Sequence, residues 1–307
     1  MSPVRKTQFQ ILEIPKRGSL VLISELGQET GSFKFRAAWS VVSNINAQHF
    51  LAASSGNFGQ ALARAAQLSG KKATIVMPTT SAKIKISAVK SYGAEVILVD
   101  TNIESRASCV ERIHAEHPEY YRASAYDCSH VIEGNSSLGF EIATSGIHLD
   151  RVIAPIGGGG LSSGIIKGLC LAGSSIPVWG AEPLMANDAS LSIQKGVLCV
   201  NEKEPQTIAD GARTVSLGHR NWKILKEGLH GIFEITESEI MTTMAHLDNF
   251  GIRVEPTGAL SVAAGIRLLR QGIKDRIGCV LSGGNFDEEE YKKFVFQGRK
   301  NIIHNDF

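Results

Sequence analysis

The chain of 307 residues has few cysteines, and they are spread along its length. There are five, an odd number, and none forms a C-x-x-C pair; they are Cys109, Cys128, Cys170, Cys199 and Cys279. A disulfide framework requires paired cysteines in an oxidising compartment. The sequence therefore argues against such a framework, and we expect a reduced, cytoplasmic protein.

Long apolar runs and an excess of charge are also absent. The start, MSPVRKTQFQILEIPKRG, lacks the apolar core of a signal peptide, and no stretch approaches the length of a membrane span. The 32 basic residues nearly balance the 30 acidic ones, which leaves a net charge of +2. We therefore expect neither a membrane nor a nucleic-acid partner. The 43% hydrophobic content and 31 glycines are typical of a globular enzyme.

From residue 49 onward, short apolar runs alternate with helical patterns. Strands are predicted at 49–53, 73–78, 94–100, 151–156, 177–182 and 278–283, with helices between them that include 237–249 and 257–270. Parallel strands joined by helices form a doubly wound sheet. We therefore predict an α/β fold with parallel sheets flanked by helices. A small lobe of residues 48–126 is expected as an insertion in a larger lobe of residues 1–47 and 127–307.

One lysine has unusual neighbours. In the stretch ETGSFKFRAAW, Lys34 lies between Phe33 and Phe35, directly after Gly31 and Ser32. On one interpretation an amphipathic helix begins here and the lysine reaches out to solvent. On the other, apolar surroundings disfavour the charged form, so the amine is available as a nucleophile. This stretch alone leaves both interpretations open.

Four consecutive glycines, Gly157 to Gly160, follow the predicted strand 151–156 and open a helix at Leu161. Glycines let the backbone approach a ligand closely, and the N–H groups at a helix N-terminus favour an anion. The loop is therefore interpreted as a phosphate cradle, with a plain flexible turn as the alternative.

Common nucleotide motifs do not match this glycine run. The pattern G-x-G-x-x-G fails because Ser162 or Ser163 takes its last position, and the Walker pattern fails because no lysine follows Gly164. The segment Gly160-Leu161-Ser162-Ser163-Gly164 does match G-x-S-x-G, the nucleophile elbow of hydrolases. That elbow needs a tight turn directly after the strand, whereas glycines separate the two here. A hydrolase with Ser162 as nucleophile therefore stays only an alternative.

Two further polar glycine loops follow predicted strands. The first is SSGNFG at 54–59 and the second is LSGGN at 281–285. Ligands bind at the carboxyl ends of parallel strands. Hydroxyl, amide and backbone N–H groups in these loops suit a carboxylate or a ring hydroxyl of a ligand.

Together these pieces resemble the fold-type II pyridoxal-phosphate enzymes, and within them the threonine/serine dehydratase and serine racemase family. The matching segments follow the family order along nearly the whole chain. They are Thr30–Arg36, Ser54–Asn57, Pro155–Leu161, Ala181–Pro183, Thr207–Gly211, Glu255–Ala259 and Leu281–Asn285. The resemblance implies the two-lobed fold of the tryptophan synthase beta type, with pyridoxal 5′-phosphate as cofactor.

The resemblance also implies a role for individual residues. Lys34 would bond to the cofactor and act as the base at the substrate Cα. The phosphate would be held by Gly157, Gly158, Gly159, Gly160 and the N–H of Leu161; Asn57 would bond the ring hydroxyl, Ser282 would meet the pyridine nitrogen, and Phe33 and Glu255 would complete the cofactor site. The small amino-acid substrate would be bound by Ser54, Ser55, Gly56, Asn57 and Phe58.

Ser55 bears on the type of reaction. Threonine dehydratases commonly have alanine at this position, whereas the serine racemase and hydroxyaspartate dehydratase branch has serine. In that branch the hydroxyl faces the side of the substrate opposite the lysine, and a racemase requires two acid/base groups on opposite faces. The alternative is that Ser55 only helps to bind the substrate carboxylate.

The resemblance implies a divalent-cation site as well. Glu182 and Asp188, with the backbone carbonyl of Ala186, match the metal site of that branch. Oxygen ligands of this kind suit Mg²⁺, Ca²⁺ or Mn²⁺. The ion would order the loop rather than take part in the chemistry.

The sequence departs from the family pattern in places. Phe58 stands where a histidine is usual, and Gly134-Asn135-Ser136-Ser137 replaces a glycine-glutamine-glycine-threonine type run. The chain starts just before Pro3, where the family has a further helical segment that bears on dimer contacts. No regulatory domain is expected after the catalytic one, so feedback inhibition by isoleucine is not expected.

The sequence thus predicts a lyase that deaminates a small β-hydroxy amino acid, of the serine or threonine type, to a 2-keto acid and ammonia. Racemisation is expected as a second activity, and a homodimer as the assembly. The alternatives are a β-replacement enzyme and a catalytically weak protein that retains the cofactor.

Overall fold

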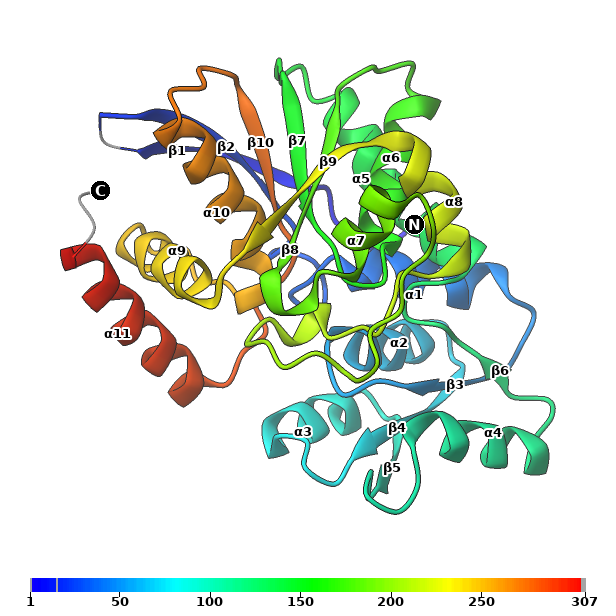
Figure 1. Cartoon of the computed structure of the whole chain (residues 1–307). Helices are drawn as coiled ribbons and strands as arrows, with labels where there is room; N and C mark the ends of the chain where they lie inside the picture. The colour runs from blue at the N-terminus through cyan, green and yellow to red at the C-terminus, as the bar shows by residue number, and fades with distance from the viewer. Residues whose placement is uncertain (1, 15, 305–307) are drawn as a thin grey trace.

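The computed structural model describes residues 2–14 and 16–304, and these form two β-sheets with helices around them (Figure 1). The strand order is β1-β2-β10-β7-β8-β9 in a six-stranded sheet and β5-β4-β3-β6 in a four-stranded sheet. β1 runs antiparallel to β2, and the other neighbouring strands are parallel. The strands are β1 Gln8–Ile14, β2 Gly18–Ser24, β3 His49–Ala53, β4 Lys72–Pro78, β5 Glu95–Val99, β6 Tyr121–Arg122, β7 Arg151–Pro155, β8 Val178–Pro183, β9 Leu229–Ile235 and β10 Ile277–Leu281.

Helices connect these strands, as parallel pairing requires. The α-helices are α1 Lys34–Asn44, α2 Asn57–Leu68, α3 Lys83–Ser91, α4 Arg106–Glu116, α5 Ser129–Ala143, α6 Gly160–Leu171, α7 Asp188–Lys195, α8 His219–Gly228, α9 Glu237–Asn249, α10 Pro256–Arg270 and α11 Glu288–His304. Two short 3-10 turns, η1 Leu184–Ala186 and η2 Asp210–Ala212, lie on either side of α7.

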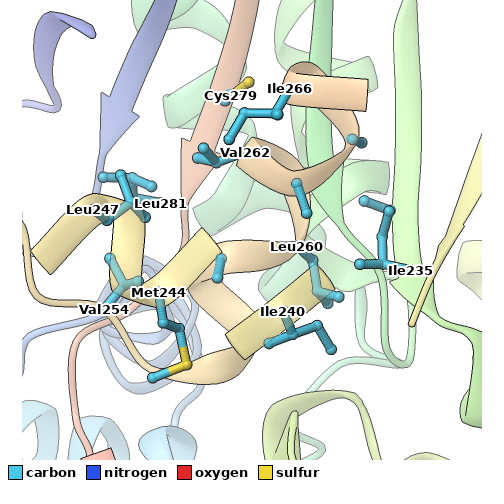
Figure 2. Packing of buried hydrophobic residues seen from close by; sticks show 14 of the residues in the cluster. Ile235, Ile240, Met244, Leu247, Val254, Leu260, Val262, Ile266, Cys279 and Leu281 are labelled. Atoms are coloured by element: carbon cyan, nitrogen blue, oxygen red, sulfur yellow. The ribbon is translucent and has the colours of Figure 1, made fainter. Parts of the chain in front are cut away.

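The six-stranded sheet is covered on both faces, and the alternation of side chains along β2 shows how. Leu20 and Leu22 join the hydrophobic cluster formed with α9 and α10. Val21 and Ile23 point the other way, into the cluster formed with α5 and α6. Figure 2 shows part of the first cluster, which gathers side chains from α9, α10 and β10. A sheet buried on both faces explains why its strands read as continuous apolar runs.

The four-stranded sheet is covered in the same way. On one face, Phe50 and Ile75 pack with α1 and α2; on the other, Leu51 and Val76 pack with α4. Helix α1 contributes Phe35 to the core of the four-stranded sheet. Just before this helix, the Phe33 N–H donates to the carbonyl of Ser282, which directly follows β10 in the six-stranded sheet. The proposed lobe boundaries at 47/48 and 126/127 stay a prediction.

The sequence predicts six of the parallel strands and several helices within a residue or two, and the predicted fold class is confirmed. It does not predict the β1–β2 hairpin, β6, β9, α5, α7, α8 and α11. Within the described ranges 2–14 and 16–304, no helix is both long and apolar enough to cross a membrane.

Candidate active site

Lys34 is the first residue of α1, and its amine is turned into the protein. Its Nζ donates to the backbone carbonyl of Ala125 at 2.8 Å. The ammonium lies 5.0 Å from the ring centre of Phe33 and 5.9 Å from that of Phe58. Burial lowers the pKa of Lys34 to about 8, and the nearby charge of Glu255 opposes this shift only in part. Lys34 is half-buried, and these contacts hold its amine against the protein rather than extended into solvent.

The glycine loop, Gly157 to Gly160, packs against Tyr126, which is next in the chain to Ala125, the hydrogen-bond partner of Lys34. Helix α6 begins at Gly160, and Gly159 caps it with φ +88°, a conformation that side chains disfavour. A Cβ on Gly158 would overlap the ring of Tyr126, and one on Gly160 would lie 3.0 Å from the Tyr126 carbonyl. Ala125, which accepts from Lys34, directly precedes Tyr126 in the chain. Lysine and glycine loop are therefore joined through one short segment.

The first N–H groups of α6 have no partner within the helix, as at any helix start. Three glycines precede the helix, and its first residue, Gly160, is also a glycine. Backbone N–H groups and the positive end of the helix dipole are therefore free to bind an anion at this point. The geometry suits the predicted phosphate cradle.

Gly158→Ala is expected to destabilise the protein, because the added methyl group overlaps Tyr126. Overpacking of this kind costs about 1–3 kcal/mol, measured as the change in the free energy of unfolding in urea. Gly27→Ala is the matched control, because a Cβ there meets only Gln8 at 3.9 Å. Equal free energies of unfolding for both variants would contradict this expectation, because they would show that Tyr126 or the loop moves aside without a loss of stability.

Ser282, in the loop after β10, is the next predicted site residue close to Lys34 in the structure. Its backbone carbonyl accepts from the Phe33 N–H at 2.9 Å, which places the LSGGN loop beside the start of α1. The Ser282 side chain is buried, and its Oγ has no hydrogen-bond partner among the described residues. A buried hydroxyl without a partner is rare, because desolvation is then uncompensated. Its oxygen is therefore open to a ligand atom.

Asn57 and Glu255 form a second polar unit near the lysine. Asn57 Nδ2 donates to both carboxylate oxygens of Glu255 at 2.8 and 2.9 Å, and Asn57 Oδ1 accepts from Asn285 at 2.8 Å. Burial, and then the charge of Asp210, raises the pKa of Glu255 to about 7. The amide of Asn57 is therefore held from both sides, by Glu255 at its nitrogen and by Asn285 at its oxygen.

The predicted substrate residues lie between β3 and the first turn of α2. Ser54 is buried and its Oγ accepts from the Gly59 N–H at 3.0 Å, so this hydroxyl shapes the loop. Ser55 and Gly56 are half-buried. Phe58 is buried in the core of the small sheet, and its ring faces Lys34. Phe58 therefore provides an apolar wall close to the amine.

The predicted metal ligands are brought together at one end of β8. Glu182 is buried and accepts from the N–H groups of Ala189 and Ser190 at 3.2 and 2.7 Å. Burial raises the pKa of Glu182 to about 9 and that of Asp188 to about 6. Asp188 Oδ2 has no hydrogen-bond partner in the part of the chain described.

The carboxylates near Ala186 do not amount to a full set of protein ligands. Among residues 2–14 and 16–304, no group of three or more His, Cys, Asp or Glu side chains is placed to hold a metal ion. An ion at Glu182 and Asp188 would therefore need the Ala186 carbonyl and water to complete its shell.

The alternative nucleophile Ser162 does not fit a hydrolase. Its side chain is fully buried in α6, and its Oγ donates to the Pro155 carbonyl at 3.4 Å. An elbow serine has to be exposed at the top of the sheet. The hydrolase alternative is therefore excluded by the burial of this hydroxyl.

Several residues at the site carry no signal in the sequence. Tyr126 packs on the glycine loop, and Asn221 Nδ2 donates to the carbonyls of Tyr126 and Gly158 at 3.0 and 2.7 Å. Arg36 lies behind Lys34 in a buried ion cluster. Their contacts are made between segments far apart in the chain, so no local pattern could have identified them.

Parallel sheets flanked by helices, a buried amine at the start of α1 and a glycine run at the start of α6 define the fold-type II class of pyridoxal-phosphate enzymes. The model of the family described as "Pyridoxal-phosphate dependent enzyme" matches residues 9–283. The chain therefore belongs to that family, and the predicted resemblance is confirmed.

Known proteins similar to the chain point to one branch of the family. The serine racemase of Schizosaccharomyces pombe is 36% identical over 88% of this chain and 84% of its own. The L-threo-3-hydroxyaspartate ammonia-lyase of Pseudomonas sp is 36% identical over 87% of this chain and 85% of its own. The crystal structure of the T.th. threonine deaminase has a TM-score of 0.81 and 36% identity, covering 87% of this chain and 88% of that one.

Proposed function

We propose that the protein is a pyridoxal-phosphate-dependent ammonia-lyase acting on small β-hydroxy amino acids, with racemase activity on the same substrates. One observation carries the proposal: the buried Ser282 hydroxyl has no hydrogen-bond partner among the described residues, and the Ser282 carbonyl accepts from the N–H of Phe33, the residue before Lys34. A pyridine nitrogen of the cofactor would bond to this hydroxyl. The lowered pKa of Lys34 and the glycine run at α6 support the same cofactor. The names of the similar proteins support the substrate class.

Each residue has a task in this proposal. When bound, the cofactor supplies the electron sink that stabilises negative charge at the substrate Cα. Lys34 would attach the cofactor and move the proton at Cα, a role open to an amine with pKa about 8. The first N–H groups of α6 would hold the phosphate. Asn57, held by Glu255 and Asn285, would bond the ring hydroxyl.

The remaining residues of the site act on the substrate. The hydroxyl of Ser55 and the N–H groups of Ser55 and Gly56 would bind its carboxylate at the start of α2. Ser54 would support them by shaping the loop, because its N–H donates to the Val76 carbonyl and its Oγ accepts from Gly59. The Ser282 hydroxyl would bond the ring nitrogen and, unlike a carboxylate, would not stabilise a proton on it. Phe33 and Phe58 exclude water from the amine. Together these features favour loss of a β-hydroxyl group over long storage of charge on the cofactor.

The test is the release of 2-keto acid and ammonia from L-serine, L-threonine and L-threo-3-hydroxyaspartate. We expect both products in equal amounts from at least one of these substrates, without an added thiol. A product that forms only with a thiol would identify a β-replacement enzyme. Cofactor absorbance with no product from any substrate would identify a catalytically weak homologue, and either result would overturn the proposal.

A divalent cation is part of the proposal. The orphaned Asp188 Oδ2 and the buried Glu182 carboxylate supply two oxygen ligands, with the Ala186 carbonyl as a third. Mg²⁺, Ca²⁺ or Mn²⁺ is expected to raise the melting temperature by about 5 °C at a hundredfold excess over the Kd. Glu182→Gln should abolish the increase, and the exposed variant Glu119→Gln should retain it. An unchanged melting temperature in the unmodified protein would contradict the site.

Cytoplasmic location and a homodimeric assembly also belong to the proposal. All five cysteines are free thiols, which supports a reducing compartment. The dimer rests on the resemblance alone, and gel filtration of the purified protein tests it. A monomer at micromolar concentration would contradict it.

A further inference from the structure

Arg36 lies two residues after Lys34, and its side chain is fully buried. Its Nε and Nη2 donate to both carboxylate oxygens of Glu25 at 2.7 and 2.9 Å. Its Nη1 and Nη2 donate to both oxygens of Glu141 at 2.8 and 3.0 Å, and Nη1 also donates to Ser137 Oγ at 2.9 Å. A planar guanidinium can hold two carboxylates in paired contacts at once, which an ammonium cannot do.

The first partner connects Arg36 to the loop that carries Ser282. Glu25 directly follows β2, and its N–H donates to the carbonyl of Leu281 at 3.0 Å. The next carbonyl, that of Ser282, accepts from Phe33 at 2.9 Å. The loop after β10 is therefore connected to α1 twice: through Glu25 to Arg36, and through the Ser282 carbonyl to Phe33. The two connections fix α1 against that loop.

The other two partners connect Arg36 to the glycine loop, because both lie on α5. A Cβ on Gly134 would overlap the Arg36 carbonyl, so the backbones of α1 and α5 are in direct contact. One residue further on, Asn135 Nδ2 donates to the Gly160 carbonyl at 3.0 Å. The run 134–137, which departs from the family pattern, therefore joins the ion cluster to the first turn of α6.

We propose that Arg36 is a positioning residue for the cofactor site. It holds Lys34, Ser282 and the glycine loop in register by joining the three elements that carry them. The N-terminal segment completes the cluster, since the Arg5 carbonyl accepts from Arg36 at 3.2 Å. Loss of the guanidinium would leave a buried carboxylate without its partner and loosen all three connections. This inference rests on the proposed role of Lys34.

The test compares pyridoxal-phosphate binding with thermal stability in the full-length protein. The variants are Arg36→Met, Arg36→Lys and Glu141→Gln, and the control is Arg267→Met. Arg267 makes paired contacts to Glu239 at 2.7 and 2.8 Å between α10 and α9, away from the site. For each variant, the melting temperature, the Kd of pyridoxal phosphate, and separate kcat and KM values are measured.

We expect Arg36→Met to weaken cofactor binding by about 10- to 100-fold and to lower kcat more than it raises KM. Arg36→Lys should recover part of the loss, and Glu141→Gln should show a smaller loss of the same kind. Arg267→Met should lower the melting temperature with an unchanged Kd.

Where Arg36→Met folds, either of two results would overturn the inference. One is a folded Arg36→Met with the Kd and kcat of the unmodified protein. The other is a loss of affinity in Arg267→Met in proportion to its loss of stability, which would make the effect general. If Arg36→Met does not fold, unchanged Kd values in Arg36→Lys and Glu141→Gln would overturn it. Failure of the unmodified protein to bind the cofactor would instead refute the proposed function.

Discussion

Lys34→Ala is expected to abolish both covalent attachment of pyridoxal phosphate and formation of 2-keto acid. The amine is the group placed to attach the cofactor and to move the Cα proton, and burial already lowers its pKa to about 8. Loss of a positioned acid/base group alone reduces turnover by about 10²- to 10⁴-fold, and loss of attachment adds to this. The measurement is keto-acid release together with the visible absorption spectrum.

Lys71, the residue before β4, is a matched control for Lys34. Lys71 is also partly buried; its Nζ donates to the carbonyls of Val42 and Ile45 at 2.7 and 3.1 Å and lies 5.4 Å from the Phe50 ring. Lys71→Ala removes a similar set of contacts away from the site, so it should retain the absorption band and most of the activity. Equal loss in both variants would mean that Lys34 acts through stability alone.

Ser55→Ala is expected to remove racemisation while keeping most of the elimination activity. Elimination needs the proton to leave from one face of Cα, which Lys34 serves, whereas racemisation also needs a proton donor on the other face. The lost donor is expected to reduce the racemisation rate by about 10²- to 10⁴-fold. Chiral chromatography of serine after incubation, run beside the keto-acid assay, separates the two activities.

The result of this comparison decides between the two roles open to Ser55. A parallel fall of racemisation and elimination, with a raised KM, would show that the hydroxyl only binds the substrate carboxylate. The half-exposed Ser40 of α1 gives a control, since Ser40→Ala changes a serine outside the site. No change in either activity is expected there.

Elements with a strong local pattern could be predicted from the sequence. The strand HFLAA and the run NFGQALARAAQL were identified because the period of their apolar residues changes from strand to helix. Strand β9 was missed because LHGIFEI is half-exposed and contains a glycine at position 231. The β1–β2 hairpin was missed because its turn carries no common turn dipeptide and has Lys16 at φ +62°.

The site could be predicted only where function depends on backbone chemistry or on a motif. The glycine run and Ser282 belong to segments whose letters alone suggest a ligand. The burial of the Ser282 side chain, on which the proposed contact with a ligand depends, follows from tertiary packing. Tyr126 and Arg36 act through contacts across the fold, so their roles could not be read from neighbouring residues.

Borohydride reduction of the holoenzyme, followed by peptide mass spectrometry, tests the central claim most directly. Reduction makes the bond between an amine and the cofactor permanent, so the attached lysine can be identified. The account predicts one modified peptide, with the mass of the reduced cofactor on Lys34. Attachment to another lysine, such as Lys71 or Lys85, or a catalytically active holoenzyme with no modified lysine, would contradict it.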